Sequence, residues 1–571
     1  MSWPNLLQYA VFLLIVALLV KPTGTYLALV FEGEKTLLDP LLRPVERLLF
    51  RLFGIDATEQ MDWKRYALCF TLFGLLGTLL LYSLLRFQSV LAGSSSAYLT
   101  TPLTPDLAAN TAISFATTTT WQAYGGESTM TYLSQMVGLC AQNFLAGAAG
   151  LALGIAFIRG LVRQQTEMLG NFWVDIVRAT LWVLLPLSLL GGIVLVWQGV
   201  PLNFDAYTPI TTLEGRQQII AQGPVAALEF IKNLGTNGGG FFNVNAAHPY
   251  ENPTPLTNFL EMLAIVVLPA AFTHTFGRLI GRPKEGWVLF GVMTALFLAG
   301  LLACGWVEQT DNPRIAALVS SVSSPPSGNL EGKEIRFGIG GSVLGAIATS
   351  NGATGSYNSM HDSYLPLGGA VPLVNMLLGE IIYGGLGTGL YSIIIVQVVA
   401  LFLAGLMVGS VPEYLGKRIG VAEVKLVALY TLLGPMVVLI LTALAVVTAG
   451  GKAGLTTNDG FHGLTEILYA YISSFANNGQ NFAGLSANST FYNLTTSFAM
   501  IIGRYGQGVV ALALAAQFAK QVRRPFTSGS LPTATVQFAG FLIATIFIVG
   551  GLSYFPVLAL GPFAEHIRLS R

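Results

Sequence analysis

Four short polar clusters rich in Thr, Asn and Gly interrupt this chain, each between two long apolar stretches. They are TTTTWQ (Thr117–Gln122), GTNGGG (Gly235–Gly240), NGATG (Asn351–Gly355) and NNG (Asn477–Gly479). The steps between Gln122, Gly238, Gly355 and Gly479 are 116, 117 and 124 residues. A nearly constant period indicates a duplicated structural unit. Polar backbone at membrane depth is tolerated only inside protein or along a water-filled cavity, so the clusters are predicted to line a cation pore.

Composition supports a membrane protein. The chain has 571 residues, of which 53% are hydrophobic and 10% are charged, whereas an ordinary soluble domain carries about 25% charged residues. The formal net charge of +1 excludes an electrostatic case for nucleic-acid binding. Cys69, Cys140 and Cys304 are scattered singly through apolar stretches, and we interpret them as buried structural thiols.

Ten apolar stretches are long enough to cross a hydrocarbon core of roughly 30 Å. They are Leu6–Val20, Tyr66–Leu85, Tyr132–Phe157, Ala179–Gln198, Phe259–Phe276, Trp287–Trp306, Met376–Val408, Leu426–Val447, Tyr492–Phe518 and Gln537–Ala559. Four apolar segments too short to span precede the clusters, and they suit re-entrant half-helices. These are Leu107–Phe115, Pro224–Leu234, Phe337–Thr349 and Leu464–Phe475. The predicted fold is an all-α polytopic membrane protein with ten transmembrane helices, in which four pseudo-symmetric units of span, half-helix, filter loop and span surround a central pore.

The units divide the chain into a first span with a cytoplasmic linker, four pore repeats and a closing span. The predicted boundaries are 1–60, 61–165, 166–282, 283–418, 419–524 and 525–571. The first apolar stretch lacks a basic leader and a small-residue cleavage site. It is therefore expected to be a retained span and not a secretory signal.

Basic residues predict the orientation, because cytoplasmic loops retain an excess of Lys and Arg. They cluster after the first span, between successive units and after the fourth unit. The clusters are Lys21, Lys35, Arg43, Arg47, Arg51, Lys64 and Arg65; Arg159, Arg163 and Arg178; Arg278, Arg282 and Lys284; Lys417, Arg418 and Lys425; and Lys520, Arg523 and Arg524. A ten-span path places all five on one face. The filter loops, the segments Gly199–Gly223 and Gln309–Arg336, and both termini are then expected outside.

The chemistry of the clusters favours a monovalent cation, potassium above sodium. Rings of backbone carbonyls replace the water shell of potassium, and glycine permits the positive φ that turns carbonyls toward an axis. No Asp or Glu lies inside a cluster, whereas carboxylate rings suit less selective or divalent passage. The candidate potassium-binding residues are Thr118, Thr119, Thr120, Gln122, Thr236, Asn237, Gly238, Ala353, Thr354, Gly355, Asn477, Asn478 and Gly479.

Two further features are candidates for control of ion movement. Arg504 lies deep in the second span of the fourth unit, where a central Arg costs on the order of 3 kcal/mol. We expect it to be a fixed charge below the filter that limits ion occupancy; a structural ion pair is the alternative. The run GGLGTG, with Gly384, Gly385, Gly387 and Gly389 after Glu380, predicts a broken helix and an internal gate. Close helix packing explains those glycines equally well.

Two histidines follow filter loops closely. His248 and His361 lack the paired spacing of metal ligands, so hydrogen bonding within the loops is the expected role.

Five longer runs resemble one family. They are GTNGGGFFNVNAAHPYENPTPLTN (Gly235–Asn258), NLEGKEIRFG (Asn329–Gly338), MHDSYLPLGG (Met360–Gly369), VPEYLGKRIG (Val411–Gly420) and LALGPFAEH (Leu558–His566). Together with the spans they resemble the potassium-binding, channel-like subunit of the bacterial Kdp potassium-transporting ATPase, within the superfamily of potassium transporters. That resemblance implies four channel-like repeats in which the first carries Gln where the others carry the key filter Gly, here Gln122 against Gly238, Gly355 and Gly479.

The resemblance also implies a function and partners. It implies high-affinity potassium uptake across the bacterial cytoplasmic membrane, with the ion passing through an intramembrane tunnel to a separate P-type ATPase subunit. A single-span subunit and a short accessory membrane peptide would complete the complex. The chain contains neither a DKTGT phosphorylation motif nor a GxxxxGK[ST] phosphate loop, so hydrolysis is expected on another subunit. Departures from the family pattern are the Thr-rich first loop, Thr354 and Ser410.

Two other classes remain as alternatives. A Trk- or Ktr-like potassium channel, gated by a soluble nucleotide-binding ring, would carry Gly in all four filters, which Gln122 and the run NPTPLTN disfavour. A secondary transporter with broken helices is disfavoured because the repetition is fourfold and not an inverted pair.

Overall fold

The computed structural model describes residues 3–92, 99–313, 328–525 and 531–569, so part of the predicted outer segment Gln309–Arg336 lies outside it. Within these residues, ten helical segments are long and apolar enough to cross a membrane. They are α1 (Trp3–Glu32), α3 (Trp63–Ala92), a π-helical turn (Ser134–Cys140) with α6 (Ala141–Val162), α7 (Phe172–Arg178) with a π-helical turn (Ala179–Leu184) and α8 (Leu185–Trp197), α10 (Pro255–Leu279), α11 (Pro283–Glu308), α15 (Thr388–Val408), α16 (Val421–Val447), α19 (Thr490–Ile501) with a π-helical turn (Ile502–Gly506) and α20 (Gln507–Lys520), and α21 (Val536–Leu558) with a π-helical turn (Ala559–Phe563) and α22 (Ala564–Leu569). The prediction of ten spans is confirmed.

Four shorter helices occupy the predicted half-helix positions. They are α4 (Pro105–Ala116), α9 (Val225–Leu234), α13 (Gly338–Asn351) and α18 (Gly460–Phe475). Each packs against the span that precedes it: α4 on α3, α9 on α8, α13 on α11 and α18 on α16. Almost every residue of α13 is buried, and so is α18 from Thr465 onward, which explains why small and apolar residues dominate these helices.

The broken helix predicted in the third unit is confirmed, and the span that follows it begins later than predicted. The structure divides Met376–Val408 into α14 (Pro366–Leu377), a non-helical stretch and α15, which begins at Thr388. The break follows from the backbone, because Gly379 and Gly387 have φ of 84° and 80°, outside the helical region. A continuous apolar sequence therefore hides two helices joined by an irregular segment that is itself buried.

The five basic loops lie on one face, as the span count requires. The first basic loop is joined to the second by β1 (Met61–Asp62) and β2 (Met168–Gly170). These strands pair antiparallel, with Met61 opposite Gly170. Lys417, beside Arg418 in the short β6 (Lys417–Arg418), donates through Nζ to the Gly160 carbonyl at 3.2 Å. Across the same face, Arg278 pairs with Glu34 at 3.7 Å.

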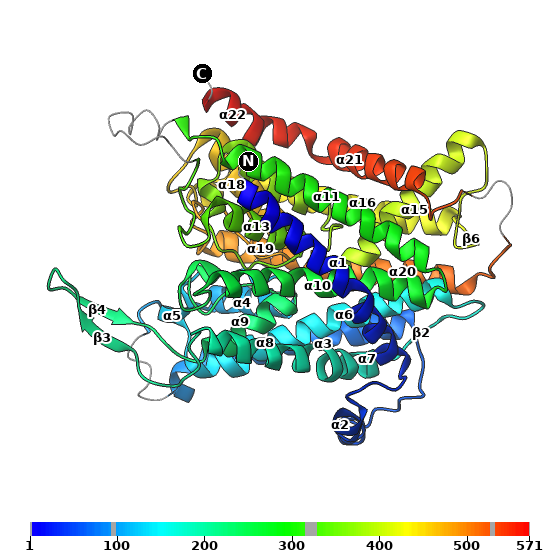
Figure 1. Ribbon diagram of the computed structural model, residues 1–571, viewed down its shortest axis with the longest axis horizontal. Helices are drawn as coiled ribbons and strands as arrows, with labels where there is room; N and C mark the ends of the chain where they lie inside the picture. Colours follow the sequence, from blue (N-terminus) through cyan, green and yellow to red (C-terminus); the bar gives the residue numbers. More distant parts are fainter. Residues whose placement is uncertain (1–2, 93–98, 314–327, 526–530, 570–571) are drawn as a thin grey trace.

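The opposite face carries the filter loops. In Figure 1 the hairpin of β3 (Thr208–Thr211) and β4 (Gln217–Ile220) lies at one end of the molecule, and the start of α1 and the end of α22 lie toward the same end. In β3 and β4, Thr208 pairs antiparallel with Ile220. At the other end lie β2 and the hairpin of β5 (Glu413–Tyr414) and β6. The amphipathic α2 (Asp39–Leu52) lies apart from the bundle, below it in this view.

Shorter elements complete the described chain. They are α5 (Gly126–Thr129), α17 (Ala449–Lys452) and two 3-10 turns at Asn245–Ala247 and His361–Ser363. The hydrophobic core is largest where α1, α6, α10, α11 and α15 meet. The outer helices α1, α3 and α21 keep exposed Leu, Ile and Phe side chains along their length, as expected of surfaces that face lipid.

Candidate functional site: four loops around a central cavity

The four filter loops meet one another in a closed ring. Loop one contacts loop two because the Thr120 hydroxyl donates to the Asn237 carbonyl. Loop two pairs with loop three in parallel at Gly238 and Gly355, and the Gly355 amide donates to the Asn237 carbonyl at 3.4 Å. Loop three approaches loop four so closely that a Cβ on Gly355 would lie 2.8 Å from the Asn478 carbonyl oxygen.

The ring closes between loop four and loop one. Asn477 Nδ2 donates to Thr119 Oγ1 at 3.0 Å, and a Cβ on Gly479 would collide with the Thr119 carbonyl oxygen. Each loop therefore touches the next in the order one, two, three, four and back to one. Chain segments more than 350 residues apart meet in this way, which is the arrangement that the periodic sequence predicts.

The loops share one backbone pattern. Immediately after the helix ends, the second loop residue has a positive φ in all four repeats: 65° at Thr118, 50° at Thr236, 49° at Ala353 and 56° at Asn477. A left-handed residue turns its peptide plane out of the helical direction, so the chain leaves the half-helix abruptly. Two residues on, φ is again positive in loops one, two and four, at 49°, 82° and 93°.

This pattern corrects the register predicted for loop one. The first residue after each half-helix donates its amide to a carbonyl four residues back: Thr117 to Ile113, Gly235 to Ile231, Gly352 to Ala348 and Ala476 to Ile472. Counting from these positions, the residue equivalent to Gly238 is Thr120, and Gln122 lies two residues further on. The Gln122 side chain instead accepts from the Gly240 amide at 2.8 Å and donates to the Gly240 carbonyl at 3.1 Å.

Side chains of the loops brace the ring from behind. Asn478 Nδ2 donates to the Thr349 carbonyl at 3.0 Å and to Glu380 Oε1 at 3.1 Å. Thr236 Oγ1 accepts from the Leu386 amide at 3.0 Å. Thr354 Oγ1 donates to the Gly352 carbonyl at 2.8 Å. These hydrogen bonds hold the four loops in place.

A buried ion network, which the sequence reading missed, supports loop two. Lys232 Nζ pairs with Glu229 at 2.7 Å and with Glu251, and all three side chains are fully buried. The Lys232 carbonyl accepts from the Asn237 amide at 2.9 Å and the Gly238 amide at 2.8 Å. Lys and Glu three residues apart inside an otherwise apolar half-helix were the signal available in the sequence.

A cavity of about 100 Å³ adjoins the ring. The residue with the positive φ after the half-helix lines it in every loop: Thr118, Thr236, Ala353 and Asn477. From there it continues past the break between α14 and α15 to α16 and α21. Its wall there includes Glu380, Gly385, Arg504, Tyr430, Gly434, Gly550 and Tyr554.

Arg504 lies in this cavity wall, on the π-helical turn Ile502–Gly506. Its Nη2 donates to the Ala146 carbonyl at 2.8 Å, and its guanidinium stands 5.7 Å from the Phe70 ring centre. No carboxylate lies within ion-pair distance of it among the described residues. The alternative of a structural ion pair therefore finds no partner in the described part of the chain.

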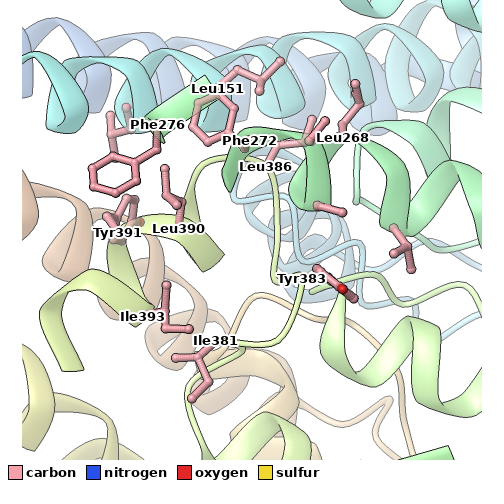
Figure 2. Packing of buried hydrophobic residues seen from close by; sticks show 14 of the residues in the cluster. Leu151, Leu268, Phe272, Phe276, Ile381, Tyr383, Leu386, Leu390, Tyr391 and Ile393 are labelled. Atoms are coloured by element: carbon pink, nitrogen blue, oxygen red, sulfur yellow. The ribbon is translucent and has the colours of Figure 1, made fainter. Parts of the chain in front are cut away.

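The glycines of the broken segment divide into two groups. Gly384 and Gly389 face each other, and Gly387 packs on the Gly150 carbonyl of α6, so close packing explains these three. Gly385 lines the cavity, and a Cβ there would lie 2.9 Å from the Ala353 side chain. Figure 2 shows the neighbouring Ile381, Tyr383 and Leu386 side chains among apolar residues of other helices.

The two histidines after filter loops are held by their surroundings. His248 stacks on Phe242 with ring centres 3.8 Å apart and accepts from the Tyr250 amide at 3.0 Å. His361 Nδ1 lies 3.0 Å from the Tyr469 hydroxyl. Hydrogen bonding within the loop is confirmed for His248, whereas His361 bonds to the half-helix α18.

Fold and site together define a polytopic membrane protein in which four polar loops meet in a ring. Residues 10–567 match the family model described as Potassium-transporting ATPase A subunit, and the chain belongs to that family. It is 50% identical to the potassium-transporting ATPase potassium-binding subunit of Rhodospirillum centenum, over 100% of this chain and 98% of the relative. The same-named proteins of Methylobacterium nodulans and Sorangium cellulosum are 50% and 48% identical, covering 99% and 100% of this chain and 97% and 100% of the relatives.

Among solved structures, the potassium transporter TrkH from Vibrio parahaemolyticus matches 87% of this chain and 97% of its own. The identity is 13% and the TM-score is 0.49.

Proposed function

We propose that this chain is the potassium-binding subunit of an ATP-driven potassium uptake system and that the ring of four loops is its selectivity filter. The observation that carries the proposal is the closed ring itself, made of uncharged backbone and joined to an internal cavity. Neutral carbonyl oxygens suit a dehydrated monovalent cation. The family assignment and the names of the relatives agree with potassium as that cation.

The predicted filter residues take different roles in this proposal. Backbone carbonyls of the residues after each half-helix bind the ion, while the side chains of Asn477, Asn478 and Thr354 hold the loops in place. Gln122 fixes the outer part of loop two through Gly240. Each half-helix also ends at the ring, so the negative end of its dipole favours a cation there.

Arg504 and the broken segment act after the filter. The guanidinium charge, unpaired by any described carboxylate, repels a second cation and limits the cavity to one ion at a time. The stretch between α14 and α15 is a gate, with Glu380 linking it to loop four through Asn478. Because the cavity continues to α16 and α21, the ion leaves the chain on that side.

The chain does not hydrolyse ATP in this scheme. It delivers potassium to the P-type catalytic subunit of the same complex, together with a single-span subunit and a short accessory peptide. The basic face is cytoplasmic and the filter faces outside the bacterial inner membrane, with both termini on the outer side. The amphipathic α2, which has Arg43, Arg47 and Arg51 between exposed leucines, suits the inner membrane surface.

Co-expression with the neighbouring subunits tests the proposal. A tagged chain should co-purify with an ATPase subunit, and ATP hydrolysis by the complex should rise with potassium. Gly238→Asp places a carboxylate where a Cβ already collides with the Gly355 backbone, so it should abolish that stimulation. Passive potassium conduction by the isolated chain in liposomes, without any ATPase partner, would overturn the assignment.

A further inference from the structure

A compact cluster of ionisable side chains lies on the outer face, away from the ring. It joins Asp362 of the 3-10 turn His361–Ser363, His462 and Glu466 of α18, and Glu565 of α22. His462 Nε2 lies 2.9 Å from Asp362 Oδ1 and 3.9 Å from Glu466 Oε1. On the other side of the ring, His462 Nδ1 lies 2.8 Å from Glu565 Oε1.

From this cluster we propose a binding site for a divalent transition metal ion, Zn²⁺ in the first instance, with His462 Nε2, Asp362 and Glu466 as ligands. One ligand atom from each of the three lies within 4.8 Å of the other two. Tetrahedral zinc with bonds of 2.0–2.2 Å places its ligands about 3.4 Å apart. The separations from His462 lie on either side of that value, so small side-chain rotations are enough.

Glu565 supplies the support that a metal-binding histidine usually has. A histidine that ligates through one ring nitrogen almost always donates its other N–H to a carboxylate or carbonyl. Here the Nδ1 hydrogen points to Glu565, which leaves the Nε2 lone pair for the metal. Glu565 is therefore a positioning residue, and it ties the last helix to the pore half-helix α18.

The cluster also contains an unpaired buried acceptor. The Glu466 side chain is fully buried; its Oε1 accepts from Asn458 Nδ2 at 2.9 Å, while its Oε2 has no hydrogen-bond partner among the described residues. Leaving a buried carboxylate oxygen unsatisfied costs free energy, and a metal ion would remove that cost. The absence of a side chain at Gly484 makes room, since a Cβ there would lie 2.9 Å from Asp362 Oδ2.

Charge favours a cation at this position. Three carboxyl side chains, those of Asp362, Glu466 and Glu565, surround the single imidazole ring of His462. A divalent cation bound at His462 Nε2 offsets more of this negative charge than the imidazole does alone. A cavity beside the cluster, lined also by Thr457 and Arg568, gives access from outside.

Zinc titration of the full chain in detergent tests the site, with Co²⁺ as a spectroscopic probe. We expect one saturable Zn²⁺ per chain and visible Co²⁺ bands of a four- or five-coordinate nitrogen and oxygen site. Asp362→Asn keeps the hydrogen bond to His462 but removes a charged ligand, and it should abolish both signals. Glu565→Gln should weaken Zn²⁺ binding about 10- to 100-fold, the usual effect of losing such a supporting group.

Asp459→Asn is the matched control, because Asp459 lines the same cavity but is not among the three ligands. It should bind Zn²⁺ as the unaltered chain does. Equal Zn²⁺ binding by Asp362→Asn and the unaltered chain, or no saturable binding by the unaltered chain, would overturn the proposal. Potassium-stimulated hydrolysis of Mg²⁺-ATP is measured separately on zinc-free complex, so a failure of the proposed transport function is distinguishable.

Discussion

Gly355→Ala perturbs the ring by packing alone, which makes its effect calculable. Gly355 has no positive φ, so alanine introduces no backbone strain. Its Cβ would lie 2.8 Å from the Asn478 carbonyl oxygen and 2.8 Å from the Gly479 carbonyl carbon, both of them backbone atoms. Since ordinary contacts begin near 3.4 Å, loops three and four must separate by about 0.6 Å.

That separation should appear in potassium affinity. Overpacking of a well-packed site costs about 1–3 kcal/mol. The ring must return to its closed form to hold a dehydrated potassium ion, so this cost is subtracted from the free energy of potassium binding. At 1.4 kcal/mol for each factor of ten, affinity should fall about 5- to 150-fold. Rubidium is larger than potassium, so its affinity should fall less.

The assay is potassium-stimulated ATP hydrolysis by the purified complex, titrated with potassium and with rubidium. Gly291→Ala is the control, because Gly291 lies on α11 with no atom within 4 Å of an added Cβ. A folded Gly355→Ala complex with the half-saturating potassium concentration of the control would refute the reasoning.

Three other substitutions test neighbouring parts of the site. Lys232→Met leaves Glu229 and Glu251 buried without their cation, so the free energy of unfolding should fall by about 3–5 kcal/mol; an unchanged thermal midpoint in nanodiscs would contradict this. Gly387→Ala puts a side chain at a φ of 80° and against the Gly150 carbonyl, so the free energy of unfolding should fall by more than the 1–2 kcal/mol of left-handed strain alone. The same thermal assay measures this loss, and a loss below about 1 kcal/mol would contradict the close packing of Gly387 on α6. Arg504→Gln removes the cavity charge and should raise potassium leak per ATP hydrolysed, whereas unchanged coupling in liposomes with intact folding would remove Arg504 from the mechanism.

Much of the fold could be predicted because a membrane imposes strong rules on sequence. Span length, the short helices before each cluster and the basic loops all follow from apolar length and charge. In the sequence, only the high glycine content signalled the break in the third unit. The other residues between Leu377 and Thr388 are as apolar as those of a membrane span, and tertiary packing holds them in place.

The register of loop one could not be read from composition. In loops two to four a glycine marks the third residue after the helix cap, whereas Thr120 adopts a positive φ of 49° at that place in loop one. The nearest distinctive residue was Gln122, two positions too far along. The equivalent residues of the four loops can be matched only from the backbone hydrogen bonds at the end of each half-helix.

The outer cluster could not be predicted for a different reason. Asp362 precedes His462 by 100 residues and Glu565 follows it by 103, so no local spacing in the sequence connects the three. The fold brings them together because the turn after loop three, the start of α18 and the last helix all reach the same face. Long-range juxtaposition of this kind leaves no periodic signal in one sequence.

Ion density in the ring tests the central claim most directly. A high-resolution map of the complex with Rb⁺ or Tl⁺ in place of potassium would locate the bound ion. One strong peak is expected, enclosed by all four loops, on the cavity side of Gly355 and next to Thr118, Thr236, Ala353 and Asn477. A ring empty of the heavy ion, while the same preparation hydrolyses ATP in response to it, would contradict the account.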